Sequence, residues 1–171
     1  LDRVRDSFIV GCFTGLRFSD FSNLQPQHFK KIGGVEVVEI VTQKTKQKVT
    51  IPIHPKVRAI LNKYDGVMPR QITNQKMNDY LKELAEIAEI TEPIRETYYK
   101  GNERIDEVTP KYNLLSTHAG RRTFICNALA LGIPPQVVMK WTGHSDYKAM
   151  KPYIDIADQT KINAMEKFNL L

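Results

Sequence analysis

Cysteine is scarce in this sequence, and long apolar runs are missing. The 171 residues include two cysteines, Cys12 and Cys126, which have no Cys-x-x-Cys spacing. A disulfide framework or a zinc knuckle is therefore not supported, and we expect a reducing compartment such as the cytoplasm. No stretch reaches the roughly 18 apolar residues of a membrane span, and the first residues are not a secretory signal, so no membrane partner is expected. The sequence begins with Leu1 rather than Met, which predicts a fragment of a longer chain.

The residues that are present indicate a folded, basic protein. Hydrophobic residues make up 42% of the chain and charged residues 26%, which suits one compact domain or a small pair. Lys and Arg number 25 against 19 Asp and Glu, a net charge of +6 that favours an acidic partner such as nucleic acid. Residues 30–63 hold eight basic and two acidic side chains, whereas residues 83–107 hold eight acidic and three basic ones. We expect a polyanion to meet the first segment and to be repelled by the second.

Hydrophobic periodicity and turn residues predict a mostly helical α+β domain with a small antiparallel sheet. Residues 35–41 and 49–53 alternate around a polar turn, which predicts a β-hairpin with Lys44 and Lys46 at its tip. A second hairpin, without an assigned role, is expected at residues 94–108. Helices are expected at residues 3–14, 20–24, 55–63, 74–89 and 135–143. Ser19 is the expected cap of the second of these, and another helix starts at residue 116 or 117 and ends at residue 132. Residues 145–171 are expected to form one or two helices, with an interruption at Pro152.

Several polar residues lie in otherwise apolar helical segments. Arg17 lies at an expected helix junction, and His118 and Arg121 lie in the first turn of a later helix. His144 follows the glycine that ends the next helix. Each of these alone has an ordinary explanation as a surface, capping or helix-ending residue. Their combination with a lysine at a hairpin tip and a late tyrosine, without a carboxylate cluster, indicates a shared chemical role.

Phosphoryl transfer is the chemistry that such a set performs. Two guanidinium groups can neutralise the negative charge of a five-coordinate phosphoryl transition state, so no metal is needed. A metal-dependent nuclease would need several carboxylates near these residues, and the acidic residues cluster elsewhere. A Lys or His can donate a proton to a departing sugar oxygen, and a Tyr hydroxyl can attack phosphorus to form a phosphotyrosine ester.

The order and spacing of these residues resemble the tyrosine recombinases, also called phage-type integrases. The similar motifs, which span residues 14–153, are Thr14-Gly15-Leu16-Arg17, His118-x-x-Arg121, Trp141-Thr142-Gly143-His144-Ser145 and a Tyr nine residues after His144. The whole looks most like integrases of conjugative transposons or related mobile elements. The resemblance implies that residues 1–171 are the catalytic domain, with an amino-terminal core-binding domain absent from this chain.

The resemblance also implies a role for each residue. The catalytic residues would be Arg17, Lys44, His118, Arg121, His144 and the nucleophile Tyr153, with Asp20 bracing Arg17. Lys46 is the alternative to Lys44, and Tyr147 is the alternative nucleophile, although it lies only three residues after His144. The expected DNA contacts are Lys46, Lys48, Arg122 and Lys140.

The sequence departs from the family pattern at a few positions without losing a chemical role. The family usually has Glu where Asp20 stands and often His where Arg122 stands. Ala119-Gly120 replaces a more typical Asp-Leu, and Thr142 replaces a typical Leu.

The function implied by the resemblance is site-specific DNA recombination or integration in the bacterial cytoplasm. Strands would be cleaved and rejoined through a 3′-phosphotyrosine intermediate, without metal, ATP or another cofactor. The implied partners are a double-stranded recombination site, a homotetramer on that DNA, and accessory DNA-bending or directionality proteins. Three alternatives stay open: a type IB topoisomerase-like nicking-closing enzyme, an inactive DNA-binding relative and a metal-dependent nuclease.

Overall fold

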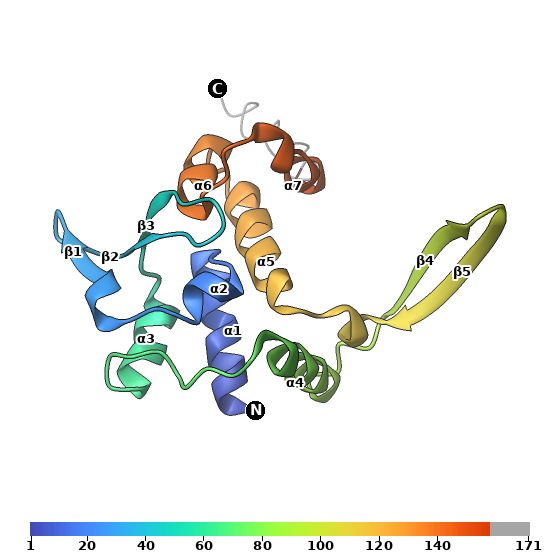
Figure 1. Cartoon of the computed structure of the whole chain (residues 1–171), viewed down its shortest axis with the longest axis horizontal. Helices are drawn as coiled ribbons and strands as arrows, with labels where there is room; N and C mark the ends of the chain where they lie inside the picture. The colour runs from blue at the N-terminus through green and yellow to red at the C-terminus, as the bar shows by residue number, and fades with distance from the viewer. Residues whose placement is uncertain (158–171) are drawn as a thin grey trace, which may run out of the picture.

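Two helices that pack against each other form the centre of the molecule, α1 (Asp2–Thr14) and α5 (Thr117–Ala130) (Figure 1). The structure is a computed structural model and describes residues 1–157. Gly120 lets the two helices approach closely, because a Cβ atom there would lie 3.3 Å from the backbone nitrogen of Cys12 and 3.3 Å from the ring of Phe8. A larger side chain at this position would push the helices apart.

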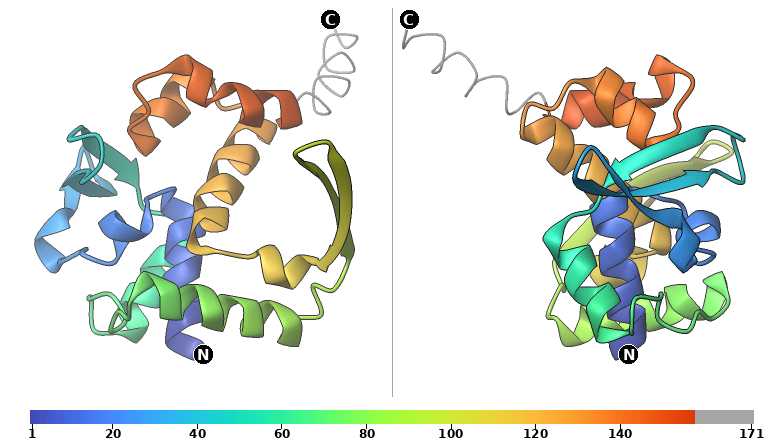
Figure 2. Two further views of the ribbon diagram at one scale, coloured as in Figure 1. Left: turned by 45° about the vertical axis from the view of Figure 1, so that its right-hand side comes forward. Right: turned by 90° about the vertical axis from the view of Figure 1, so that its left-hand side faces the viewer.

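The other elements surround this pair, and Figure 2 shows them from two further sides. Helix α3 (Pro55–Lys63) and helix α4 (Asn74–Ile87) pack near the beginning of α1, whereas α6 (Pro135–Thr142) and α7 (Lys151–Ala157) lie near the end of α5. The short elements are α2 (Phe18–Phe21) and the 3₁₀ turns η1 (Pro26–His28), η2 (Lys111–Leu114) and η3 (Tyr147–Ala149). None of the described helices is long and apolar enough to cross a membrane.

A three-stranded antiparallel sheet packs beside α1. Its strands are β1 (Phe29–Ile32), β2 (Val35–Val41) and β3 (Lys48–Pro52), with β2 in the middle. Val38 pairs with Ile51 and Ile40 pairs with Val49, and all four side chains are buried. Because side chains alternate between the two faces of a strand, this register places one face of the sheet in the core.

The apolar side chains form two clusters. The larger cluster joins α1, the sheet, α3 and α4. The smaller cluster has Ile125, Ala128, Val138 and Met150 at its centre and holds α6 and α7 against α5. The site residues near the end of the chain are therefore positioned by the second cluster.

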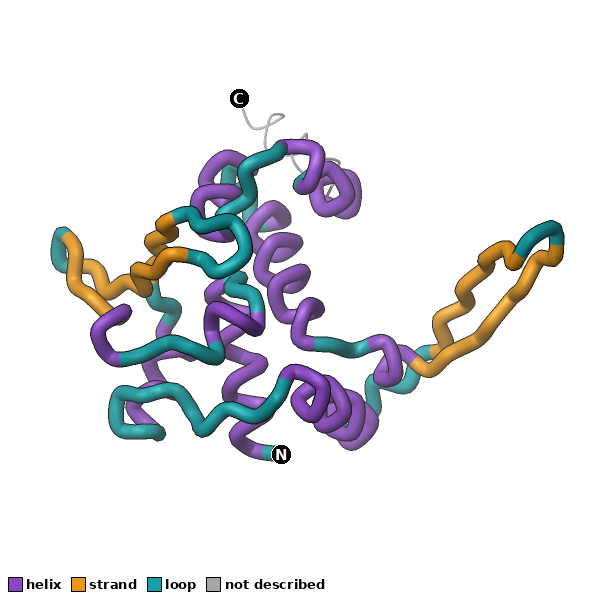
Figure 3. Tube along the Cα trace, viewed as in Figure 1, coloured by secondary structure: helices purple, strands orange, loops and turns teal. Residues whose placement is uncertain are grey.

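A second hairpin stands apart from the helices, as the tube in Figure 3 shows. It consists of β4 (Pro93–Lys100) and β5 (Glu103–Pro110), which pair with each other in a two-stranded sheet. The hairpin expected at residues 94–108 is therefore confirmed.

The predicted fold class is confirmed, and four local details differ. Strand β1 was not predicted. Helix α2 starts at Phe18 with Arg17 as its N-cap, so Ser19 lies inside the helix rather than capping it. Helix α5 ends at Ala130, two residues before Gly132. Pro152 lies in the first turn of α7, where its missing N–H is harmless, so it does not interrupt a helix. The helix expected toward residue 171 lies mostly outside the described residues.

Candidate active site

Arg121 is the most deeply buried cation of the candidate site, with 2% of its surface exposed. From α5 it donates Nη1–H to the carbonyl of Gly15 at 2.8 Å and Nη2–H to the carbonyl of Thr142 at 2.7 Å. Its Nη2 also lies 3.1 Å from Nε2 of His144. A guanidinium has five N–H groups, so Nε–H and one Nη1–H are left for a ligand. Burial, with the charge of Arg17, lowers the Arg121 pKa to about 10, so the group is still a cation at pH 7.

Arg17 lies where the chain turns from α1 into α2. Gly15 ends α1 in the left-handed conformation, with φ of 67°, and the next residues lead to Arg17 at the N-cap of α2. The Nη1 atom of Arg17 is buried and has no hydrogen-bond partner among the described residues. A buried donor without a partner is costly, and a phosphate oxygen would satisfy it.

The two histidines are kept neutral by their surroundings. Burial, followed by the charges of Arg121, Arg17 and His118, lowers the pKa of His144 to about 4. The pKa of His118 is also lowered, first by burial and then by nearby cations. Those cations are Arg121, Arg122, Arg17 and Lys44. Arg17, Lys44 and Arg121 are therefore near enough to His118 for their charges to disfavour its protonation.

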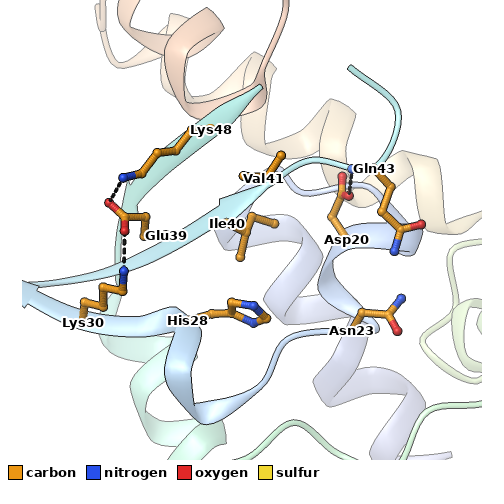
Figure 4. Close-up of a pocket in the computed structure, with 9 residues that line it drawn as sticks. All are labelled: Asp20, Asn23, His28, Lys30, Glu39, Ile40, Val41, Gln43 and Lys48. Atoms are coloured by element: carbon orange, nitrogen blue, oxygen red, sulfur yellow. Dashed lines mark hydrogen bonds and ion pairs between the residues drawn. The ribbon is translucent and has the colours of Figure 1, made fainter. Parts of the chain in front are cut away.

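The loop that carries Lys44 is anchored on both sides of this lysine. Before it, the backbone N–H of Gln43 donates to Oδ1 of Asp20 at 2.8 Å (Figure 4). The Gln43 side chain also donates to the carbonyl of Ser19 at 2.9 Å. After it, the hydroxyl of Thr45 donates to the carbonyl of Gly143 at 3.2 Å. The loop is thus fixed beside both Arg17 and His144, while the Lys44 side chain is exposed.

Asp20 differs from the expectation that it braces Arg17 directly. Its Oδ1 accepts the Gln43 amide, its Oδ2 is buried without a partner, and within residues 1–157 no ion pair joins it to Arg17. The carboxylate instead holds the Lys44 loop in place. This role of Asp20, like those of Gln43 and Thr45, could not be predicted from the sequence, because these contacts join segments far apart in the chain.

Tyr153 lies in the first turn of α7 and packs against the smaller apolar cluster. It lies close enough to Arg121 that a negative charge on its phenol would raise the Arg121 pKa. Tyr147 lies in η3 with 52% of its surface exposed. Of the two tyrosines, Tyr153 is the one near enough to the buried arginine to affect its pKa.

The expected DNA contacts differ in their surroundings. Lys46, Arg122 and Lys140 are exposed. Lys48 pairs with Glu39 at 3.0 Å, and Lys30 pairs with the same carboxylate at the side of a cavity of about 450 Å³ on the sheet (Figure 4). Lys48 is therefore partly neutralised.

Solved structures of site-specific recombinases share this fold. The chain matches XerH recombinase bound to a palindromic difH substrate with a TM-score of 0.66 and 13% identity, over 98% of this chain and 46% of that one. It matches Tn1549 transposon integrase in complex with circular intermediate DNA with a TM-score of 0.57 and 15% identity, over 89% of this chain and 53% of that one. XerA recombinase gives a TM-score of 0.58 at 12% identity, over 98% and 63% of the two chains.

The chain therefore has the fold of a tyrosine recombinase catalytic domain, and the likeness to a transposon integrase agrees with the resemblance seen in the sequence. It spans about half the length of the recombinases that it matches. No family model and no curated protein matches the sequence.

Proposed function

We propose that this chain is the catalytic domain of a site-specific DNA recombinase that acts through Tyr153. The observation that supports the proposal is the pair of arginines, Arg121 and Arg17, whose charges act on each other, with Tyr153 near enough to Arg121 to affect its pKa. Arg121 is fixed by Gly15 and Thr142, with Nε–H and one Nη1–H left for a ligand, and Arg17 presents a buried Nη1 without a partner among the described residues. A scissile phosphate between them would satisfy these donors, and its developing charge in the transition state would be stabilised.

In the first step, Oη of Tyr153 attacks phosphorus and the bond to the 5′-oxygen breaks. The tyrosine proton passes to a neutral imidazole, for which the exposed His118 is the candidate. The leaving 5′-oxygen takes a proton from Lys44, whose loop is fixed at both sides. The products are a 3′-phosphotyrosine ester and a free 5′-hydroxyl.

In the second step, the 5′-hydroxyl of a partner duplex attacks the phosphotyrosine and restores Tyr153. The phosphoester bond energy is conserved throughout, so this sequence of steps requires neither ATP nor a metal ion. Exchange between duplexes needs several protomers on the DNA, which we propose to be a homotetramer that includes the core-binding segment of the longer protein. Accessory DNA-bending or directionality proteins would join it, and we place the reaction on DNA in the bacterial cytoplasm.

The test is to trap the covalent intermediate in the full-length protein on a nicked DNA substrate. The wild type and Tyr147→Phe should form an adduct that resists denaturant, with peptide mapping to Tyr153. Tyr153→Phe should bind the DNA equally well and give no adduct, because it lacks only the attacking oxygen. An adduct of undiminished yield in Tyr153→Phe would disprove the assignment. Two differently marked duplexes then distinguish recombination from rejoining of the same strand, which is the topoisomerase-like alternative.

A further inference from the structure

Thr142, the last residue of α6, makes contacts that set the protonation of the candidate site. Its side chain is completely buried, and its Oγ1 lies 2.7 Å from the carbonyl oxygen of Val138 and 2.7 Å from Nδ1 of His144. Its backbone carbonyl also accepts the Nη2–H of Arg121. One residue therefore contacts both the buried arginine and the histidine.

The direction of these hydrogen bonds follows from counting hydrogens. A hydroxyl has one hydrogen, and the Val138 carbonyl can only accept, so Oγ1–H of Thr142 must point to it. If it pointed to His144 instead, Oγ1 of Thr142 and the carbonyl oxygen of Val138 would face each other at 2.7 Å without a hydrogen between them. The Thr142 oxygen then accepts from His144, which requires the hydrogen of the neutral imidazole to be on Nδ1.

The contact with Arg121 does not choose between the tautomers. Nη2 of Arg121 lies 3.1 Å from Nε2 and 3.4 Å from Nδ1 of His144, so the guanidinium approaches both ring nitrogens rather than the lone pair of one of them. The assignment of the hydrogen to Nδ1 therefore rests on the Thr142 hydroxyl.

We propose that Thr142 is a positioning residue, which fixes His144 as the Nδ1–H tautomer and thereby leaves Nε2 as a hydrogen-bond acceptor in the site. The effect of this tautomer on catalysis rests on the proposed recombinase function, whereas the assignment of the tautomer does not. Burial and the charge of Arg121 lower the pKa of His144, so the ring is neutral at pH 7 and a tautomer is defined. A leucine or isoleucine at this position would have no oxygen to accept the Nδ1–H of His144.

An ordinary structural role is the alternative. A threonine often donates to the carbonyl four residues earlier in a helix, with no effect on another side chain. Thr142→Val keeps the shape and removes the hydroxyl, whereas Thr142→Ser keeps the hydroxyl and removes a methyl group. These two variants separate the two roles.

The first measurement is the tautomer itself, by long-range ¹H–¹⁵N NMR of the 171-residue chain labelled at histidine. The chain has four histidines, and His144→Gln assigns the resonances of interest. We expect Nδ1–H in the wild type and in Thr142→Ser, and a shift toward Nε2–H in Thr142→Val. Nε2–H in the wild type would overturn the proposal, as would unchanged Nδ1–H in Thr142→Val. If Thr142→Val does not fold, the wild type and Thr142→Ser still decide the tautomer.

The second measurement is the rate of covalent adduct formation at saturating DNA in the full-length protein. Thr142→Val should slow it by about tenfold, the effect of losing the one hydrogen bond that orients His144, whereas Thr142→Ser should stay within about twofold of the wild type. Equal rates of adduct formation for the wild type and both variants would disprove a role of Thr142 in catalysis. If the wild type forms no adduct, the proposed function fails, while the NMR result still stands by itself.

Discussion

Replacing Gly15 with alanine should destabilise the protein far more than the same change at another left-handed glycine. Gly15 has φ of 67°, and a Cβ atom there would lie 2.4 Å from Cδ1 of Phe124. The conformation alone costs an alanine about 1–2 kcal/mol, and forcing a methyl group into a packed site costs about 1–3 kcal/mol more. Phe124 cannot easily move aside, because its ring packs edge-on against Trp141. The expected loss in the free energy of unfolding is therefore about 2–5 kcal/mol.

Gly132 provides the matched control. It has φ of 80°, and a Cβ atom there would meet nothing within 4 Å. Gly132→Ala should therefore lose only the conformational part, about 1–2 kcal/mol. Urea unfolding followed by circular dichroism measures the free energy of unfolding of both variants, provided that its dependence on urea concentration, the m value, is the same as in the wild type. Equal losses at the two glycines would refute the reasoning about Phe124, and Phe124→Leu should recover part of the loss in Gly15→Ala.

Three further predictions concern the site and the end of the chain. Lys44→Ala should slow cleavage about 10²- to 10⁴-fold at saturating DNA, because the leaving 5′-oxygen loses its proton donor. A substrate with sulfur in place of the bridging 5′-oxygen needs no proton, so it should restore cleavage by Lys44→Ala but not by Arg17→Ala. Without this rescue, Lys44 is only a phosphate contact. The pKa of His144 falls from 6.5 to about 4 on folding, so the unfolded chain takes up this proton first as the pH drops. Stability should therefore fall between about pH 6.5 and pH 4, by about 2 kcal/mol after allowance for solvent screening, and urea unfolding of His144→Gln should lack this part; the same pH dependence in both proteins would contradict it. The sequence after Tyr153 is partly apolar, and the family resemblance implies that such a tail docks on a neighbouring protomer, the alternative being its own domain. Deletion of residues 157–171 should then spare DNA binding but weaken tetramer assembly, and unchanged assembly in analytical ultracentrifugation on DNA would reject docking on the neighbour.

Local sequence signals predicted most of the elements. Gly15 and Gly143 end their helices in the left-handed conformation, and Pro55 and Pro135 begin theirs, so these boundaries follow from the chemistry of single residues. Strand β1 was missed because Lys30 and Lys31 interrupt its apolar pattern. It forms because β2 offers a partner, which is a property of the sheet and not of the segment.

The candidate site was only partly predictable for the same reason. The sequence predicted Arg17 at a helix junction, Arg121 near the start of a helix and His144 just after a helix end, and the structure has them there, because such positions are local information. The hydrogen bonds between Gln43 and Asp20, and between Thr45 and Gly143, link separate elements. Thr142 departs visibly from the family pattern in the sequence, but its contact with His144 depends on the turn that follows α6.

The anchors of the candidate site have a consequence for when the protein becomes active during synthesis. Arg121 is held by a carbonyl 106 residues before it and another 21 residues after it, and the lysine loop is tied to a carbonyl 98 residues downstream of Thr45. A nascent chain that has emerged only as far as α5 lacks the Thr142 and Gly143 carbonyls. It also lacks Tyr153. Under the proposed function, DNA cleavage therefore waits for one late event in folding, and a chain that stops before Thr142 lacks the groups that would cut.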